Sequence, residues 1–308
     1  MDEFKYVYGP VPSRRLGISL GVSPIPKKTC NYSCIYCQLG RTTRMINHRQ
    51  LFYPVDNIIA ELKTFFQKNI NYDVITIVGE GEPTLYSGLG QLIEKLHKLT
   101  NKPIAVITNG SLLYDPDVQS DLMQSDILLP TLDAYDEKSF KKINRPYSSL
   151  NYYKVLNGLE DFSRKYKGQL WLEIMFMKGI NDDPNTIIKY SEILKKIKYE
   201  KLYLNTPVRP PAEIDVFALD HEKMEHIAEI LNGFSIDLLS SHGFYSEIKN
   251  DYEAFVSIIK RHPMNQFEIE EFLKSRGNSF PEKFMENLET DASLAIIEYK
   301  GYRTYRLK

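Results

Sequence analysis

Short apolar runs alternate with amphipathic stretches along this chain from about residue 18 to residue 206. Runs of β-branched and aliphatic residues occupy residues 17–22, 73–78, 104–108, 126–131, 170–177 and 201–206. Most are apolar at successive positions, as strands covered on both faces of a parallel sheet are. Helical stretches separate them at residues 55–67, 88–99, 136–143, 150–166 and 184–197. This alternation predicts the α/β class with a parallel sheet, either open or curled toward a barrel.

The number of strands narrows the architecture. Six strands are too few for a closed eight-stranded barrel, so we predict a partial, open barrel over residues 1–211. In such sheets, binding and catalytic residues gather at the carboxyl ends of the strands. Polar and glycine-containing segments follow the strands here, namely GEGEPT (79–84), TNGS (108–111), TLDA (131–134), KGIND (178–182) and NTPVRPP (205–211). We therefore expect the functional site at that end of the sheet.

The alternation stops after residue 211. Residues 212–261 predict an extension with helices near 220–231 and 252–260 and a short strand, SIDLL (235–239). Residues 262–308 predict a helix, a turn, a second helix and a terminal hairpin around Lys300 and Gly301. That order is typical of a winged-helix-like domain, so the chain is predicted to contain three units.

All three cysteines of the chain, Cys30, Cys34 and Cys37, lie within eight residues. Cysteines this close together are poorly placed to form disulfides with one another, and an odd number would leave one thiol unpaired. The set therefore suits a metal centre in a reducing compartment better than disulfides. Three closely spaced thiolates can hold a [4Fe–4S] cluster and leave one iron without a protein ligand. Zinc is the alternative metal, but it needs a fourth ligand, and the nearest histidine, His48, lies eleven residues after Cys37. Three buried cysteines without a metal are the remaining alternative.

Composition excludes several other classes of protein. With 43% hydrophobic and 26% charged residues, the chain is expected to be globular, neither disordered nor a disulfide-rich miniprotein. No apolar run approaches the roughly 20 residues that span a bilayer. The first residues, MDEFKYVYGP, lack the basic and then apolar pattern of a signal peptide. We expect a cytoplasmic protein with no membrane partner.

The segment CNYSCIYC resembles the CxxxCxφC signature of radical S-adenosylmethionine (SAM) enzymes, in which φ is an aromatic residue, here Tyr36. Further segments, among them GEGEPTL, ITNGSLL, TLDAYDEKSFKKINRP and LNTPVRPPAE, are similar to the branch that includes the tRNA wybutosine-synthesising radical SAM enzymes. Those enzymes carry extra cysteines for a second cluster, and this chain has none. It is therefore not expected to carry out their particular condensation.

The resemblance implies a fold, a cofactor set and a reaction. The fold is a partial (β/α)6, TIM-like radical SAM barrel. Cys30, Cys34 and Cys37 would hold a [4Fe–4S] cluster, and the amino and carboxylate groups of SAM would chelate the fourth iron. Reduction, by a partner such as flavodoxin or ferredoxin, would cleave SAM to methionine and a 5′-deoxyadenosyl radical that abstracts hydrogen from a substrate. Whether the overall reaction is that of an oxidoreductase or a transferase stays open.

The resemblance also implies roles for six further residues. Gly81, Glu82 and Pro83 match the motif that holds the SAM amino group, and Tyr36 would lie beside the adenine. Asn109 and Asp133, at the ends of two strands, would reach the SAM ribose or the substrate. For Asn109, an ordinary Asn-Gly turn is the alternative.

Charge is uneven along the chain, which bears on the substrate. Residues 1–50 carry eight Lys or Arg and two Asp or Glu. Arginine binds carboxylate and phosphate bidentately, so an anionic substrate is predicted to meet Arg14, Arg15, Arg145 and Arg209. The alternative is that each of these is an ordinary surface or strand-end arginine.

Three functions remain open at this point. The first is a radical SAM enzyme that acts on RNA, with the winged helix and the basic N-terminal segment gripping phosphates; because MENLETD (285–291) is acidic for a recognition helix, protein or substrate contact by the winged helix is as credible as nucleic acid. The second is a radical SAM enzyme for a small molecule or a protein, with the winged helix as a protein-interaction module. The third is an iron–sulfur DNA-binding redox sensor, against which the GEP motif counts because a sensor does not need to bind SAM.

Overall fold

The computed structural model describes residues 4–237, 243–246, 248–278 and 280–308. Its main element is an eight-stranded sheet with the order β1-β2-β5-β6-β7-β8-β9-β10. The strands are β1 (Val7–Ser13), β2 (Gly17–Val22), β5 (Val74–Ile77), β6 (Ile104–Thr108), β7 (Ile127–Pro130), β8 (Gln169–Met175), β9 (Lys201–Asn205) and β10 (Phe234–Ser235). All neighbours are parallel except β1 and β2. The α/β class and the six predicted strands are confirmed.

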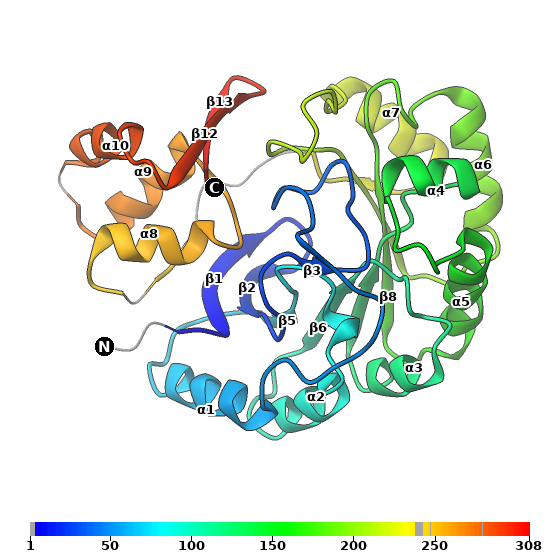
Figure 1. Cartoon of the computed structure of the whole chain (residues 1–308), viewed down its shortest axis with the longest axis horizontal. Helices are drawn as coiled ribbons and strands as arrows, with labels where there is room; N and C mark the ends of the chain where they lie inside the picture. The colour runs from blue at the N-terminus through cyan, green and yellow to red at the C-terminus, as the bar shows by residue number, and fades with distance from the viewer. Residues whose placement is uncertain (1–3, 238–242, 247, 279) are drawn as a thin grey trace.

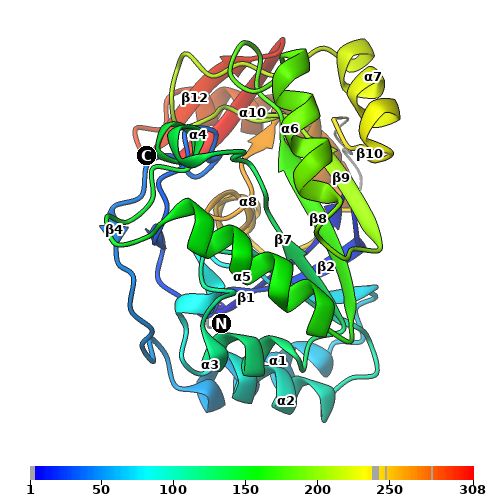
Figure 2. The same cartoon turned by 90° about the vertical axis from the view of Figure 1, so that its right-hand side faces the viewer.

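Seven helices follow the strands of this sheet. They are α1 (Val55–Phe66), α2 (Leu89–His97), α3 (Pro116–Leu122), α4 (Glu137–Ile143), α5 (Tyr152–Lys165), α6 (Pro184–Leu194) and α7 (His221–Leu231). Figure 1 shows them in an arc outside the strands, and Figure 2 shows α5 and α6 along the outside of β7 and β8. Aspartate or asparagine side chains cap the amino ends of α3 to α7 by accepting backbone N–H bonds. None of the helices in the described part of the chain is long and apolar enough to cross a bilayer.

Two strands were not among the six predicted, and they change the sheet. The antiparallel β1 makes it mixed, and β10 extends the opposite edge. β1 escaped prediction because its sequence, VYGPVPS, contains two prolines, which strands tolerate chiefly at an edge. Within the described residues β1 and β10 do not pair, so the sheet is open rather than a closed barrel.

The carboxyl-terminal residues form a second apolar core. It contains a three-stranded sheet of order β11-β13-β12 and three helices. These elements are α8 (Asp251–Ile259), β11 (Met264–Asn265), α9 (Gln266–Ser275), α10 (Pro281–Glu289), β12 (Leu294–Tyr299) and β13 (Tyr302–Leu307). Val11 of β1 belongs to the same core, and α8 contacts β1, so this C-terminal module packs on the edge of the main sheet (Figure 1).

The order of elements in the module agrees with the helices and hairpin predicted for residues 262–308. Its classification as a winged-helix-like domain stays a prediction, as do the boundaries at residues 211 and 261. Phe255 of α8 packs against Phe284 of α10 and Tyr305 of β13, so α8 shares the module's core. The strand predicted at SIDLL (235–239) overlaps the observed β10 (Phe234–Ser235) only at Ser235, because Ile236 and Asp237 lie outside a strand and residues 238–239 lie outside the described part of the chain.

Candidate functional site

A cavity of about 360 Å³ opens among the loops that follow the strands. Cys30, Cys34 and Cys37 line it together with Tyr36 and Gly81. Beside the apolar strand residues Val11, Ile107 and Met175, four polar side chains of the strands also face it, and these are Ser19, Thr76, Glu173 and Asn205. A filled barrel interior would present branched apolar side chains at such positions. The sequence therefore leaves this part of the sheet unfilled and able to hold a ligand.

The loop that carries the three cysteines (residues 30–37, the cysteine loop) is held in two places. Cys30 ends the short strand β3 (Thr29–Cys30), which pairs in parallel with β4 (Arg44–Met45). The backbone N–H of Ser33 donates to the carbonyl of Asn144 at 2.9 Å, and that of Ile35 donates to the carbonyl of Ile143 at 2.9 Å. The loop is thus held on the end of α4, a contact across more than 100 residues of sequence. Sequence spacing alone could not show this second attachment.

Polar N–H groups surround two of the three sulfurs. The Cys30 Sγ accepts from the Tyr32 backbone N–H at 3.4 Å and from the Asn109 side-chain amide at 3.7 Å. The Cys34 Sγ accepts from the Asn144 side-chain amide at 3.6 Å. Donors of this kind stabilise a sulfur that carries negative charge, as a metal-bound thiolate does.

Burial opposes ionisation of the free thiols. It raises the pKa of all three cysteines, and the charges of Glu82 and Asp133 add to the rise for Cys30 and Cys34 respectively. Buried thiols without a cation are therefore neutral, while a bound metal would supply the positive charge that ionises them. The donor set suits a metal centre better than a nucleophilic cysteine.

The spacing of the sulfurs bears on which metal they would suit. Among the described residues, ligand atoms of one set of three His, Cys, Asp or Glu side chains lie within 4.8 Å of one another, and that set is not the cysteines. Thiolates on a single tetrahedral zinc with Zn–S bonds of about 2.3 Å would be roughly 3.8 Å apart. His48, the nearest histidine in sequence, is exposed.

Gly81 lies where two backbones meet. A Cβ at this position would overlap the carbonyl oxygen of Thr29, the residue before Cys30. The next residue, Glu82, donates its backbone N–H to the same carbonyl at 3.1 Å. Glycine is needed here to let the loop formed by Gly81, Glu82 and Pro83 (the GEP loop) run against the cysteine loop.

The carboxylate of Glu82 is occupied by the protein itself. It accepts from the Thr84 N–H at 3.0 Å and hydroxyl at 2.6 Å, the Thr108 hydroxyl at 2.6 Å and the Asn109 N–H at 2.7 Å. Burial raises the pKa of Glu82, and these four bonds oppose that rise. Glu82 therefore ties the GEP loop to the end of β6, and Pro83 begins the buried 3₁₀ turn η1 (Pro83–Leu85) that follows.

Tyr36 and Asp133 are joined rather than separate. The Tyr36 hydroxyl donates to one Asp133 oxygen, and the Met175 N–H donates to the other at 3.0 Å. The Asn144 amide donates to the first oxygen at 3.2 Å, so Asn144 bridges Asp133 and Cys34. Burial raises the pKa of Asp133 to about 6, against the opposing effect of the Tyr36 bond. Asp133 orients the cysteine loop through Tyr36 in this structure.

Arg14 and Arg15 lie in the turn between β1 and β2, not at the end of a parallel strand. Arg15 pairs with Glu173 of β8. Arg14 donates to the Asn205 side-chain oxygen at 2.9 Å and to the carbonyl of Ile236, which follows β10. The turn thus crosses the open side of the sheet and joins its two edges. Both arginines still line the cavity, as expected of substrate residues.

The other two predicted arginines are placed differently. Arg209 lines the cavity but is buried, and it donates to the Pro263 carbonyl at 2.7 Å, to His262 at 2.6 Å and to Glu268 at 2.8 Å. It therefore clamps the C-terminal module to the end of β9. Arg145 is not among the lining residues, and it pairs with Glu213.

Four polar residues are among the lining residues that were not predicted as site residues. Glu173 and Asn205 stand on β8 and β9, and Arg261 and His262 come from the link between α8 and β11. A carboxylate inside the apolar run WLEIM was a signal that could have found Glu173. The link residues gave no such signal, because only the docking of the module brings them to the cavity.

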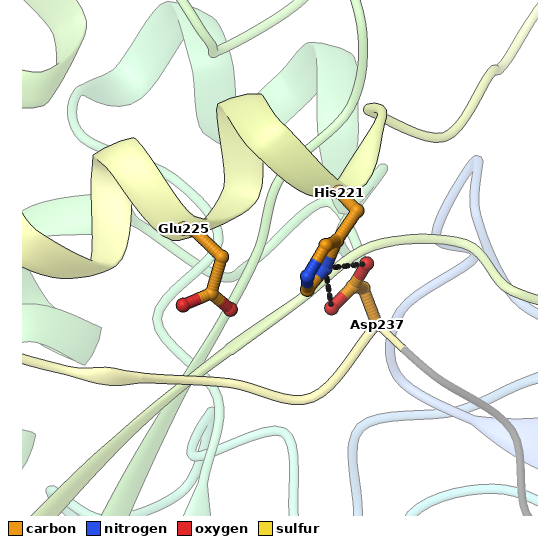
Figure 3. A group of neighbouring side chains, drawn as sticks. All are labelled: His221, Glu225 and Asp237. Atoms are coloured by element: carbon orange, nitrogen blue, oxygen red, sulfur yellow. Dashed lines mark hydrogen bonds and ion pairs between the residues drawn. The ribbon is translucent and has the colours of Figure 1, made fainter.

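A second polar cluster lies away from the cysteines, at the start of α7 (Figure 3). His221 and Glu225 are one turn apart on α7, and the His221 Nδ1 lies 3.0 and 3.2 Å from the two oxygens of the buried Asp237. Asp237 also accepts from the Ser235 hydroxyl at 2.7 Å. The cluster holds the start of α7 against the chain that leaves β10.

Comparison with known proteins agrees with this geometry. The sequence matches the radical SAM superfamily over residues 25–191. A UPF0026 protein of Methanocaldococcus jannaschii is 37% identical over 308 residues, covering 96% of this chain and 93% of that protein. The GTPase Obg of Brachyspira hyodysenteriae is 44% identical over 221 residues, which is 72% of this chain but only 32% of that protein.

Solved structures agree at the level of the fold. A radical SAM methyltransferase from Sphaerobacter thermophilus has a TM-score of 0.54 at 15% identity, and the match covers 70% of this chain and 66% of that one. Streptococcus suis SuiB, solved bound to S-adenosylmethionine, has a TM-score of 0.51 at 15% identity, and the match covers 72% of this chain and 48% of that one. The chain belongs to the radical SAM superfamily, within the UPF0026 family, and is a radical SAM enzyme.

Proposed function

We propose that the chain holds a [4Fe–4S] cluster on Cys30, Cys34 and Cys37 and uses it with SAM to abstract hydrogen from an anionic substrate. The observation that carries the proposal is the joint lining of one cavity by the three cysteines and by Gly81 of the GEP loop. When bound, the cluster would supply the electron that cleaves SAM to methionine and a 5′-deoxyadenosyl radical. The protein's part is to hold both cofactors and to exclude water.

The residues present suit the cluster. Backbone and side-chain N–H groups point at the sulfurs of Cys30 and Cys34, and the sulfurs are spaced more widely than one zinc ion requires. Lys28 and Arg306 lie near Cys37, where their charges lower its pKa against the effect of burial. Cationic neighbours favour the negative charge of a thiolate-bound centre.

The GEP loop would bind SAM mainly through its backbone. The Glu82 carboxylate already has four donors within the protein, whereas carbonyl groups of a loop that contains glycine can accept from an ammonium group. Tyr36 lines the cavity with its hydroxyl held by Asp133, which leaves its ring to pack beside an adenine. Asn109 donates to Cys30 and to Asn31, so its nearer role is to support the cysteine loop.

The cavity supports a small anionic substrate in preference to tRNA. Its basic side chains lie inside it, on the turns and loops around the strands, while two basic side chains of the C-terminal hairpin are engaged within the module. Arg303 pairs with Glu289, and the Lys308 ammonium donates to the Ala292 carbonyl at 2.7 Å. RNA stays the second candidate, because of the resemblance to the wybutosine branch, and a protein substrate is the third.

The cluster is tested by anaerobic reconstitution of the full chain. We expect about four irons per chain, a SAM-dependent change in the electron paramagnetic resonance spectrum of the reduced protein, and reductive release of 5′-deoxyadenosine. Each of the variants C30A, C34A and C37A should lose that release while S33A, in the same loop, keeps it. Stoichiometric zinc without iron uptake would overturn the proposal.

The substrate is tested separately. Fractions of a cell extract are added to reduced enzyme and SAM, and the fraction that stimulates 5′-deoxyadenosine release is identified. Stimulation by a fraction that passes a small-molecule filter supports the small anion. Stimulation by tRNA, with binding that weakens steeply as salt rises, would favour the second candidate instead.

A further inference from the structure

The charges that line the cavity do not balance. Five basic and two acidic side chains line it, and these are Lys28, Arg14, Arg15, Arg209 and Arg261 against Glu80 and Glu173. His262 adds no charge, because burial and then the nearby arginines hold its pKa well below the usual range. A solvent-screened surface can carry such an excess freely, but a partly enclosed cavity favours an anion that offsets it.

Two of the basic residues already have carboxylate partners of their own. Arg261 lies 3.3 Å from Glu80, and Arg209 lies 2.8 Å from Glu268, which is buried behind the cavity wall. Both arginines also donate to backbone carbonyls. The positive charges of Arg209 and Arg261 are thus largely neutralised by contacts that hold the C-terminal module and the GEP loop in place.

Arg14 and Arg15 share one carboxylate between them. Glu173 pairs directly with Arg15, while Arg14 meets only neutral oxygens, from Asn205 and Ile236, as hydrogen-bond acceptors. The charge of Asp237 also acts on Arg14, but Asp237 is itself bound by His221 and Ser235. Burial lowers the pKa of Arg14, and the charge of Arg15 lowers it further.

Arg15 retains an unused donor. Its Nη1 bonds to Glu173, but its Nε is buried and has no acceptor among the described residues. The Nε edge of a guanidinium is one of the two edges that match a pair of carboxylate or phosphate oxygens. A small turn of the side chain toward the cavity, which Arg15 lines, would bring that edge to a ligand.

We propose that Arg15, with Arg14, Asn205 and Glu173 around it, is a subsite for the carboxylate or phosphate group of a small substrate. The anion accepts from the free edge of the Arg15 guanidinium, and Asn205 helps to fix the position of Arg14 and Glu173, to both of which it bonds. Glu173 limits affinity, because its negative charge repels the anion. This proposal rests on the proposed function and adds to it the chemical group by which the substrate is held.

The test measures anion binding by calorimetry on the reconstituted full chain, without SAM or reductant. The probes are inorganic phosphate and, separately, succinate. The probe that binds with the higher affinity shows whether the substrate's anchoring group is a phosphate or a carboxylate. R15Q should lower the affinity for the preferred probe at least tenfold. E173Q should tighten it severalfold, because the repelling charge is gone while the Gln oxygen can still accept from Asn205. R164Q, which alters an exposed arginine on α5 that pairs with Asp161, should leave binding unchanged.

The opposite signs of R15Q and E173Q separate a binding role from a structural one. If the arginines only join the edges of the sheet, both variants will impair the protein in the same direction, and the subsite is refuted. Failure of both probes to bind at millimolar concentration also refutes it. Displacement of one phosphate per chain by SAM would assign Arg15 to the SAM carboxylate instead. Because iron content and SAM cleavage are measured apart, failure here is distinguishable from failure of the proposed function.

Discussion

Replacing Gly81 by alanine tests whether the close approach of two loops sets the cofactor geometry. A Cβ at residue 81 overlaps the Thr29 carbonyl, which belongs to backbone rather than to a flexible side chain. The two backbones must therefore part by on the order of 1 Å, and a displacement of that size at a reacting centre costs roughly 100-fold in rate. Since Thr29 precedes Cys30, the shift separates the GEP loop from the first cysteine of the proposed cluster site.

The assay compares reductive release of 5′-deoxyadenosine with iron content and far-ultraviolet circular dichroism. We expect G81A to keep its fold and most of its iron but to lose about two orders of magnitude in SAM cleavage. G277A is the matched control, because nothing lies within 4 Å of a Cβ at Gly277, although its φ of +78° brings some backbone strain. SAM cleavage by G81A at more than a third of the wild-type rate would refute the reasoning.

Three further predictions concern stability and the sulfurs. R209M should lower the free energy of unfolding by about 3–5 kcal/mol, because it leaves the buried carboxylate partner of Arg209 without a counter-charge, and a loss below about 1 kcal/mol in urea denaturation would contradict this. N144A should make the reduction potential of the cluster more negative, since it removes an N–H donor from the Cys34 sulfur, and a redox titration followed by electron paramagnetic resonance that shows no shift would count against it. Hydrogen bonds from two arginines, Arg41 first, lower the pKa of Glu213 to about 2, so its contribution to stability is present above about pH 4.5 and is lost as pH falls through about 2. The stability difference between wild type and E213Q, measured by urea denaturation, should shrink across that range, and a constant difference would disprove the assignment.

The sequence sufficed for the parts of the fold that depend on local pattern. The six apolar runs became strands with boundaries within two residues of the structure, and the helices between them followed. β1 was missed because its prolines mask an edge strand, and α3 because a seven-residue helix carries little periodicity. The open sheet was expected from the strand count, but the pairing of β1 and β10 at its two edges was not, since strand pairing at an edge depends on contacts that no local pattern encodes.

The site was predictable where chemistry is concentrated in a short motif. The three cysteines and Gly81 meet in one cavity, as their places at the ends of strands implied. The tasks of individual side chains were harder to foresee. Arg15 reaches Glu173 across 158 residues of sequence, and Arg14 reaches Asn205 across 191. The Glu82 carboxylate already accepts four hydrogen bonds from other residues. Which donors reach it depends on the folded structure, and no local sequence pattern indicates them.

These long-range contacts make the C-terminal module a part of the site. Arg261, which follows α8, pairs with Glu80 in the same GEGEP segment that contains Gly81, and Arg209 pairs with Glu268 of α9. The Tyr299 hydroxyl of β12 donates to the Pro207 carbonyl at 2.8 Å, beyond the end of β9. The loop that meets the cysteines and the loop that follows β9 are therefore both braced by the module. Because each brace acts on a loop that lines the cavity, loosening the module should disturb cofactor geometry before it unfolds the main sheet.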